Sequence, residues 1–116
     1  MFEKTFDKIK EKNSSVKIIG IWGKDGLELE KKYYVDKSDP DIDMTGAQIA
    51  DIMAKLSNLK FVSERSHFTL EGELSTLLIY AVSADYFLIV MSGKDLIMGK
   101  LLFFLSLYGE EIIASL

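Results

Sequence analysis

The sequence predicts an α/β fold of the α+β kind, in which a mostly antiparallel five-stranded sheet lies between helical layers. The segments Glu73 to Ser83 and Asp85 to Ser92 have strand length, and neither has a polar face. Because successive side chains of a strand alternate between the two faces of a sheet, both strands must be covered on both sides. A third observation is the apolar stretch from Asp95 to the last residue, which predicts a helix.

The first third of the chain predicts a helix followed by a β-hairpin. Residues 2–12 carry apolar side chains at helical spacing among charges. Residues 16–22 and 27–35 are strand-like and flank the tight turn Gly23-Lys24-Asp25-Gly26, which is typical of a hairpin.

The middle of the chain predicts a second helix and a polar strand. A loop around the only proline, Pro40, leads to Asp43 or Thr45 as the helix cap. The apolar stripe of this helix is Ile49, Ile52, Met53, Leu56 and Leu59. The strand Phe61 to Glu71 is much more polar than the two that follow, so we expect it at an edge of the sheet. The resulting order is α-β-β-α-β-β-β-α, with connections inside each strand group that suit antiparallel hairpins.

Length and composition are those of one globular domain spanning residues 1–116, with 48% hydrophobic residues. The absence of cysteine excludes disulfides and thiolate metal sites, and agrees with a cytoplasmic location. The net charge of −4, from 14 basic and 18 acidic residues, disfavours nucleic-acid binding. No segment has the roughly 20 consecutive apolar residues of a membrane span.

Catalytic and metal-binding patterns are incomplete. Asp39, Asp41 and Asp43 alternate like calcium ligands, but Met44 stands where a calcium-binding loop requires glycine. His67 is the only histidine, and no nucleophile motif accompanies it. We therefore expect no catalytic residues, no metal site, no cofactor and no enzyme activity.

The second helix carries two surfaces of interest. Small residues recur beside its apolar stripe and favour either contact with another helix or simply a well-formed exposed helix face. Polar residues project further out. The small residues are Ala47, Ala50, Ala54 and Ser57, and the polar ones are Gln48, Asp51, Lys55 and Asn58.

The C-terminal helix has two apolar faces. Leu101, Leu105, Tyr108 and Ile112 define a core face, whereas Leu96, Phe103 and Leu107 lie roughly opposite. We expect the first helix to cover this second face through its own apolar residues. If it does not, the face is a partner-binding patch.

The chain resembles the Roadblock/dynein light chain family of bacterial or archaeal type in three segments. These are the hairpin turn at residues 23–27, the apolar strand at 85–90 and the helix start Leu96-Ile97-Met98-Gly99-Lys100-Leu101. The resemblance implies a dimer whose edge strands join two sheets, with the second helices side by side. It also implies a non-catalytic regulator or scaffold of Ras-like GTPases, as in bacterial polarity and gliding systems, or an adaptor subunit.

The residues and the resemblance together give one leading hypothesis, a homodimeric binding module that regulates or scaffolds a small Ras-like GTPase. The expected dimer interface is Ala47, Ala50, Ala54, Ser57, Arg65 and His67, and the expected partner site is Gln48, Asp51, Lys55 and Asn58. Since Arg65 is the only arginine and lies on the edge strand, we expect activation by ordering of switch loops rather than by an arginine finger. The alternative is an adaptor or ligand-sensing domain without a GTPase partner.

Overall fold

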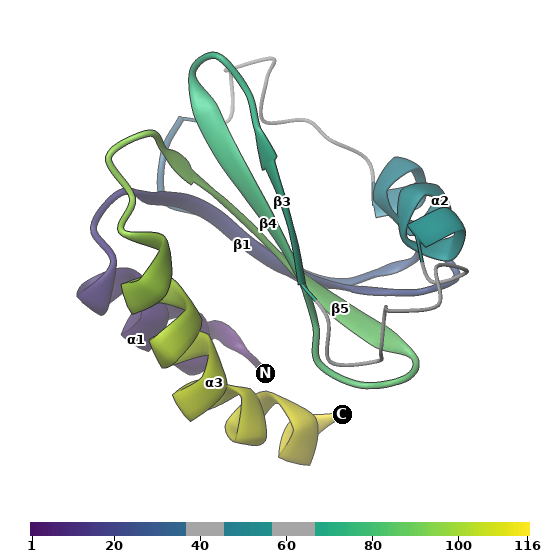
Figure 1. Cartoon of the computed structure of the whole chain (residues 1–116). Helices are drawn as coiled ribbons and strands as arrows, with labels where there is room; N and C mark the ends of the chain where they lie inside the picture. Colours follow the sequence, from purple (N-terminus) through teal and green to yellow (C-terminus); the bar gives the residue numbers. More distant parts are fainter. Residues whose placement is uncertain (37–45, 57–66) are drawn as a thin grey trace.

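A computed structural model describes residues 1–36, 46–56 and 67–116 of the chain. These residues form an antiparallel five-stranded sheet in the order β2-β1-β5-β4-β3. Figure 1 shows α1 and α3 on one face of the sheet and α2 on the other. The elements are α1 (Glu3–Lys12), β1 (Val16–Gly23), β2 (Glu28–Tyr33), α2 (Gly46–Leu56), β3 (His67–Glu71), β4 (Ser75–Ala81), β5 (Tyr86–Gly93) and α3 (Met98–Ser115). The fold class and the order of elements predicted from the sequence are confirmed.

The β1–β2 hairpin closes through the predicted glycine-rich turn. The Gly26 N–H donates to the Gly23 carbonyl at 2.9 Å, and the Leu27 N–H donates to Asp25 Oδ1 at 3.0 Å. Gly26 has a φ of 89°, a conformation that glycine adopts without steric cost. The hairpin prediction is therefore confirmed, although β2 is shorter at both ends than residues 27–35.

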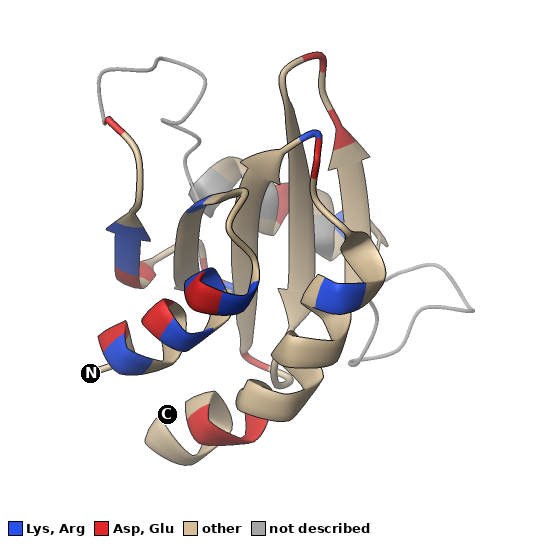
Figure 2. Ribbon diagram, turned by 90° about the vertical axis from the view of Figure 1, so that its left-hand side faces the viewer, with Lys and Arg blue, Asp and Glu red and all other residues tan. Residues whose placement is uncertain are grey.

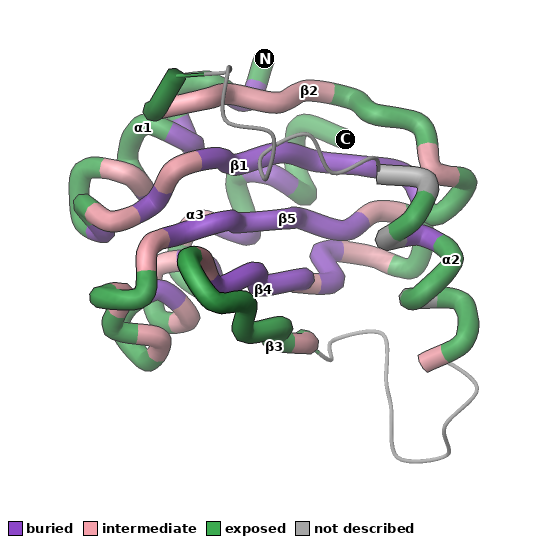
Figure 3. The backbone as a smooth tube through the Cα atoms, turned by 90° about the horizontal axis from the view of Figure 1, so that it is seen from above, coloured by how far each residue is buried: buried purple, intermediate pink, exposed green. Residues whose placement is uncertain are grey.

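The two faces of the sheet support separate core clusters, as the alternation in the last two strands predicts. Leu78, Leu88 and Val90 face α1 and α3, and join a cluster with residues of both helices. Leu77, Ile79 and Phe87 point to the opposite face and join the cluster that contains Ala50 of α2. Figure 3 shows that burial is concentrated along β1, β5 and β4, whereas β3 is largely exposed. The three central strands are thus covered on both sides.

The expectation that the first helix covers the outer face of the last one is wrong. Phe6 and Ile9 of α1 are fully buried in the same cluster as Leu101 and Leu105 of α3, so the two helices lie side by side on the sheet. Phe103 remains 61% exposed and Leu107 54% exposed, while Leu96 is half-buried at the margin of the core. α1 therefore covers part of the sheet beside α3, and the outer face of α3 is left uncovered by α1.

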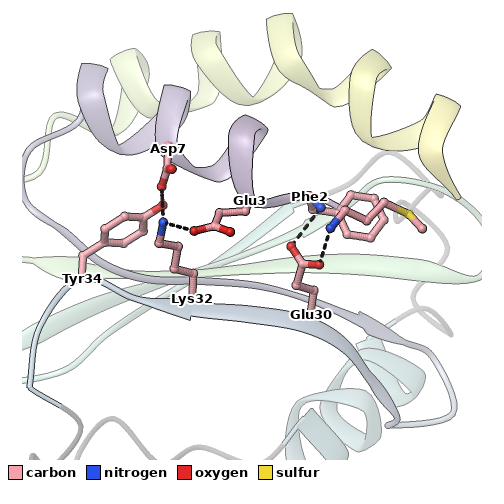
Figure 4. A network of polar contacts seen from close by, with 7 residues as sticks. Phe2, Glu3, Asp7, Glu30, Lys32 and Tyr34 are labelled. Atoms are coloured by element: carbon pink, nitrogen blue, oxygen red, sulfur yellow. Dashed lines mark hydrogen bonds and ion pairs between the residues drawn. The ribbon is translucent and has the colours of Figure 1, made fainter.

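A polar network fixes α1 to β2 (Figure 4). Lys32 Nζ contacts Glu3 Oε1 at 2.7 Å and Asp7 Oδ1 at 2.8 Å, and the Tyr34 hydroxyl donates to Asp7 at 2.6 Å. Lys32 and then Tyr34 hold the pKa of Asp7 below its ordinary value. Burial, reinforced by the bond to Asp7, raises the pKa of the Tyr34 phenol. The docking of α1 therefore combines apolar burial beneath the helix with charge pairing at its side.

Two predicted boundaries differ from the observed ones. α3 begins at Met98 rather than Asp95, because residues 93–96 form a turn in which the Leu96 N–H donates to the Gly93 carbonyl at 3.3 Å. The expected helix caps Asp43 and Thr45, and residues 61–66 of the expected edge strand, lie outside the described residues. Within the described part of the chain, no helix is long and apolar enough to cross a membrane.

Candidate protein-interaction surface

The edge strand β3 is the first component of the candidate surface. It pairs with β4 from His67 opposite Tyr80 to Glu71 opposite Thr76, and no other described strand lies beyond it. The free edge therefore presents backbone groups that a further strand can pair with. The prediction that this segment is an edge strand is confirmed for its described residues.

The two edges of the sheet differ in how they are protected. β2, at the opposite edge, carries Lys31 and Lys32, and charged side chains on an edge strand discourage pairing with another chain. β3 has the sequence His-Phe-Thr-Leu-Glu and contains no lysine. Of the two edges, β3 is the one suited to pairing.

The face of β3 towards α2 is apolar and adjoins a shallow groove. Phe68 is half-buried against the core cluster on that side, whereas Leu70 remains 44% exposed. A groove of 370 Å³ lies between Leu70, Leu77 and Met91 and the β3–β4 turn, where Leu74 is 67% exposed. An apolar side chain from a partner fits such a groove.

The rotation of α2 on the sheet differs from the one expected. Ala50, assigned to the contact with another helix, is 8% exposed and packs against the molecule's own sheet. Ile52, assigned to the apolar stripe facing the sheet, is 37% exposed. The small side chain of Ala50 therefore makes a contact within the chain.

The outer face of α2 is mainly polar. Gln48, Asp51 and Lys55 are exposed as expected, and Asp51 forms an ion pair with Lys55 at 3.3 Å one helical turn away. Ile52 lies on the same exposed face, and this is the residue that the sequence reasoning missed. An exposed isoleucine among polar residues is suited to anchor a partner, since interfaces combine a buried apolar centre with a polar rim.

The remaining predicted interface residues divide between the exposed surface and the part of the chain outside the description. Ala54 is exposed on α2, and the exposed His67 ring stacks on Tyr80 with 6.4 Å between ring centres. Ser57, Asn58 and Arg65 lie outside the described residues, as does the side chain of Ala47. The assignment of these residues to a dimer interface or a partner site stays a prediction.

Potential chemical sites are sparse over residues 1–36, 46–56 and 67–116. No group of three or more His, Asp or Glu residues in these ranges has an arrangement that can hold a metal ion. His67 stands exposed on the edge strand, beside the ring of Tyr80. The described surface does offer a free strand edge, an apolar groove and the outer face of α2, which together suit binding of another polypeptide.

The described residues thus form a small α/β domain, with an antiparallel five-stranded sheet and helices on both of its faces. Three solved structures share this architecture with the chain over most of their length. MglC from Myxococcus xanthus is 19% identical, and the match covers 99% of this chain and 98% of MglC with a TM-score of 0.68. MglB from Myxococcus xanthus is 18% identical, and the match covers 94% of this chain and 82% of MglB with a TM-score of 0.75. A Roadblock/LC7 domain from Streptomyces avermitilis is 12% identical, and the match covers 94% of this chain and 92% of that domain with a TM-score of 0.74.

The chain thus has the Roadblock/LC7 fold, which confirms the resemblance seen in its sequence. No family model and no curated protein sequence matches the chain, so the likeness is one of three-dimensional structure. At these identities it establishes the arrangement of helices and strands.

Proposed function

We propose that this protein is a non-catalytic, homodimeric binding module that regulates or scaffolds a small Ras-like GTPase. The observation that carries the proposal is the outer edge of β3, which pairs with no other described strand and, over His67–Glu71, lacks the lysines that occupy the opposite edge. Two copies of β3 related by a twofold axis pair antiparallel and join two sheets into one. Exposed Leu70 and the adjoining groove add apolar area next to the new backbone hydrogen bonds.

In such a dimer the two α2 helices lie on the same side of the joined sheet and present a duplicated polar face. Gln48, Asp51 and Lys55 form the polar part of that face, with Ile52 as its apolar anchor. A mainly polar surface with one or two apolar anchors suits a reversible regulatory contact better than a permanent one.

The GTPase is supported by the fold and by the family resemblance of the sequence. The solved structures with this fold include a gliding protein, MglB from Thermus thermophilus, with 14% identity and a TM-score of 0.70. Proteins that the sequence resembles regulate or scaffold Ras-like GTPases in bacterial gliding systems. Because the described residues provide no catalytic constellation, we expect this chain to act on the switch loops of its partner by binding them.

The test measures binding of Ras-like GTPases from the source organism in their GDP-bound and GTP-bound states, by calorimetry. Asp51→Lys combined with Lys55→Asp exchanges two charges while keeping an ion pair on the helix. We expect this exchange to weaken binding at least tenfold and to leave the dimer intact. Lys8→Glu with Glu111→Lys is the matched control, since it exchanges an exposed ion pair of 3.0 Å on the opposite face of the sheet.

Two outcomes contradict the proposal. Full binding by a folded Asp51 and Lys55 exchange variant rejects the α2 face as the site. Failure of every Ras-like GTPase to bind the unaltered protein rejects the GTPase, and then favours the adaptor or ligand-sensing alternative, for which the groove beside Leu70 is the binding site to examine.

A further inference from the structure

The outer face of α3 is an apolar surface that no other described element covers. Leu101, Leu105 and Ile112 point into the core, so the opposite side of the helix faces outward. Phe103 and Leu107 on that side are 61% and 54% exposed. Figure 2 shows that α3 is mostly uncharged along its length, with a basic residue near its beginning and acidic residues near its end.

Four exposed residues on this outer face follow the spacing of a helix-pairing seam. Lys100, Phe103, Leu107 and Glu110 are separated by three, four and three residues. This alternation keeps side chains on one stripe and is the pattern by which two helices pack side by side in a coiled coil. The stripe has two apolar residues at its centre and opposite charges at its ends.

We propose that α3 binds α3 of a second copy of this chain in antiparallel orientation, through this stripe. With the twofold axis at the level of residue 105 along the helix, Phe103 of each copy packs against Leu107 of the other. The same register brings Lys100 of each copy beside Glu110 of the other. The stripe is therefore complementary to itself under a twofold axis, which is what an interface between identical copies requires.

The charges select the antiparallel orientation. A parallel pair in register places Lys100 beside Lys100 and Glu110 beside Glu110, and like charges in contact are unfavourable. Neither Lys100 nor Glu110 forms an ion pair with another described residue. Glu111, by contrast, is already engaged by Lys8 at 3.0 Å, and it lies on the side of α3 that faces α1. Lys100 and Glu110, at the two ends of the stripe, therefore remain available for a second copy.

This contact is separate from the proposed pairing through β3, because α3 lies on the face of the sheet opposite to α2 (Figure 1). A protein that uses both contacts assembles beyond a dimer. A protein that uses only α3 is a dimer whose β3 edge stays free. The inference therefore does not depend on the proposed function.

Site-directed cross-linking tests the register, and the chain offers a clean background because it contains no cysteine. Lys100→Cys protein is mixed with Glu110→Cys protein and treated with a short bismaleimide. We expect a cross-linked pair in the mixture and little in either protein alone, since identical positions lie about 15 Å apart along an antiparallel pair at 1.5 Å per residue. Lys4→Cys mixed with Lys100→Cys is the control for random collision, because Lys4 is exposed on α1. Absence of the mixed product, or equal cross-linking of Lys100→Cys alone, overturns the proposal.

Charge reversal gives an independent readout by sedimentation velocity. Lys100→Glu should weaken the α3-dependent association at least tenfold, and adding Glu110→Lys should restore it. Association that is unchanged in Lys100→Glu, or not restored in the double variant, overturns the proposal. The variant Ala54→Arg distinguishes the α3 contact from the β3 pairing, because Ala54 lies on α2. If the Lys100→Cys and Glu110→Cys proteins still cross-link when both carry Ala54→Arg, the α3 contact is supported whether or not β3 pairs.

Discussion

The docking of α1 on the sheet gives the sharpest stability prediction, through the variant Phe6→Ala. Phe6 is fully buried in the cluster that also holds Ile9, Leu101 and Leu105. Its ring stacks on Phe2 with 6.3 Å between ring centres, so truncation removes packing within α1 as well as beneath it. The variant leaves a cavity among residues of α1, α3 and the sheet.

The expected loss follows from measured costs of such truncations. Replacing a buried phenylalanine with alanine costs about 3–5 kcal/mol, as transfer and cavity terms combined. A chain of 116 residues has a total stability of roughly 6–17 kcal/mol at about 0.05–0.15 kcal/mol per residue. Phe6→Ala should therefore remove a large part of the free energy of unfolding and lower Tm by roughly 10–20 °C at about 4 °C per kcal/mol.

Phe103→Ala is the matched control, because Phe103 is also a helical phenylalanine but is 61% exposed. Urea unfolding followed by circular dichroism should give a loss below about 1 kcal/mol for Phe103→Ala when both variants are measured at a dilution that disfavours association. Equal losses of unfolding free energy in the two variants would show that Phe6 is not more deeply buried than Phe103. That result would refute both the packing of α1 in the core and the exposure of the outer α3 face.

Three further predictions concern other parts of the fold. Lys32 depresses the pKa of Asp7, so their ion pair stabilises the folded state at pH values above the ordinary carboxyl pKa. This contribution is lost as the pH falls below about 4. The urea midpoint of Asp7→Asn should therefore decrease less between pH 7 and pH 3 than that of the unaltered protein. A Cβ on Gly20 would lie 2.3 Å from the buried Trp22 ring, so Gly20→Ala should destabilise the protein by about 1–3 kcal/mol in the same assay, and an unchanged midpoint would show that the ring moves freely. Ala54→Arg should abolish dimers formed through α2 and β3, because an arginine side chain cannot be buried there without a partner; light scattering that still reports these dimers would remove α2 from the interface.

The sequence was sufficient to predict the sheet because its strongest signals are local. Two strands without a polar face had to be central, and β4 and β5 are buried on both sides. The turn around Gly26 and the polar character of β3 likewise follow from residue type. These features depend on the chain's own alternation and turn chemistry, not on distant contacts.

The orientation of the helices was less predictable, because it depends on which of two apolar stripes of a helix packs against the sheet. On α2 the sequence offers both a large-residue stripe and a small-residue stripe. Ala50 is buried while Ile52 is partly exposed. On α3 two apolar faces were visible, but the sequence could not show that α1 would lie beside α3 and leave Phe103 uncovered. Ile52 and Phe103 are thus large apolar residues whose exposure is decided by how the helices pack on the sheet.

Backbone amide exchange measured by NMR tests whether β3 pairs with a second copy of itself. We expect the β3 amides that point away from β4 to become protected as protein concentration rises, together with a shift in mass towards at least twice 13.1 kDa. We also expect Ala54→Arg to return these amides to fast exchange without affecting β1 or β5. Fast exchange of the outward β3 amides at every concentration, in a folded protein that stays monomeric, would show that β3 does not pair with a second copy.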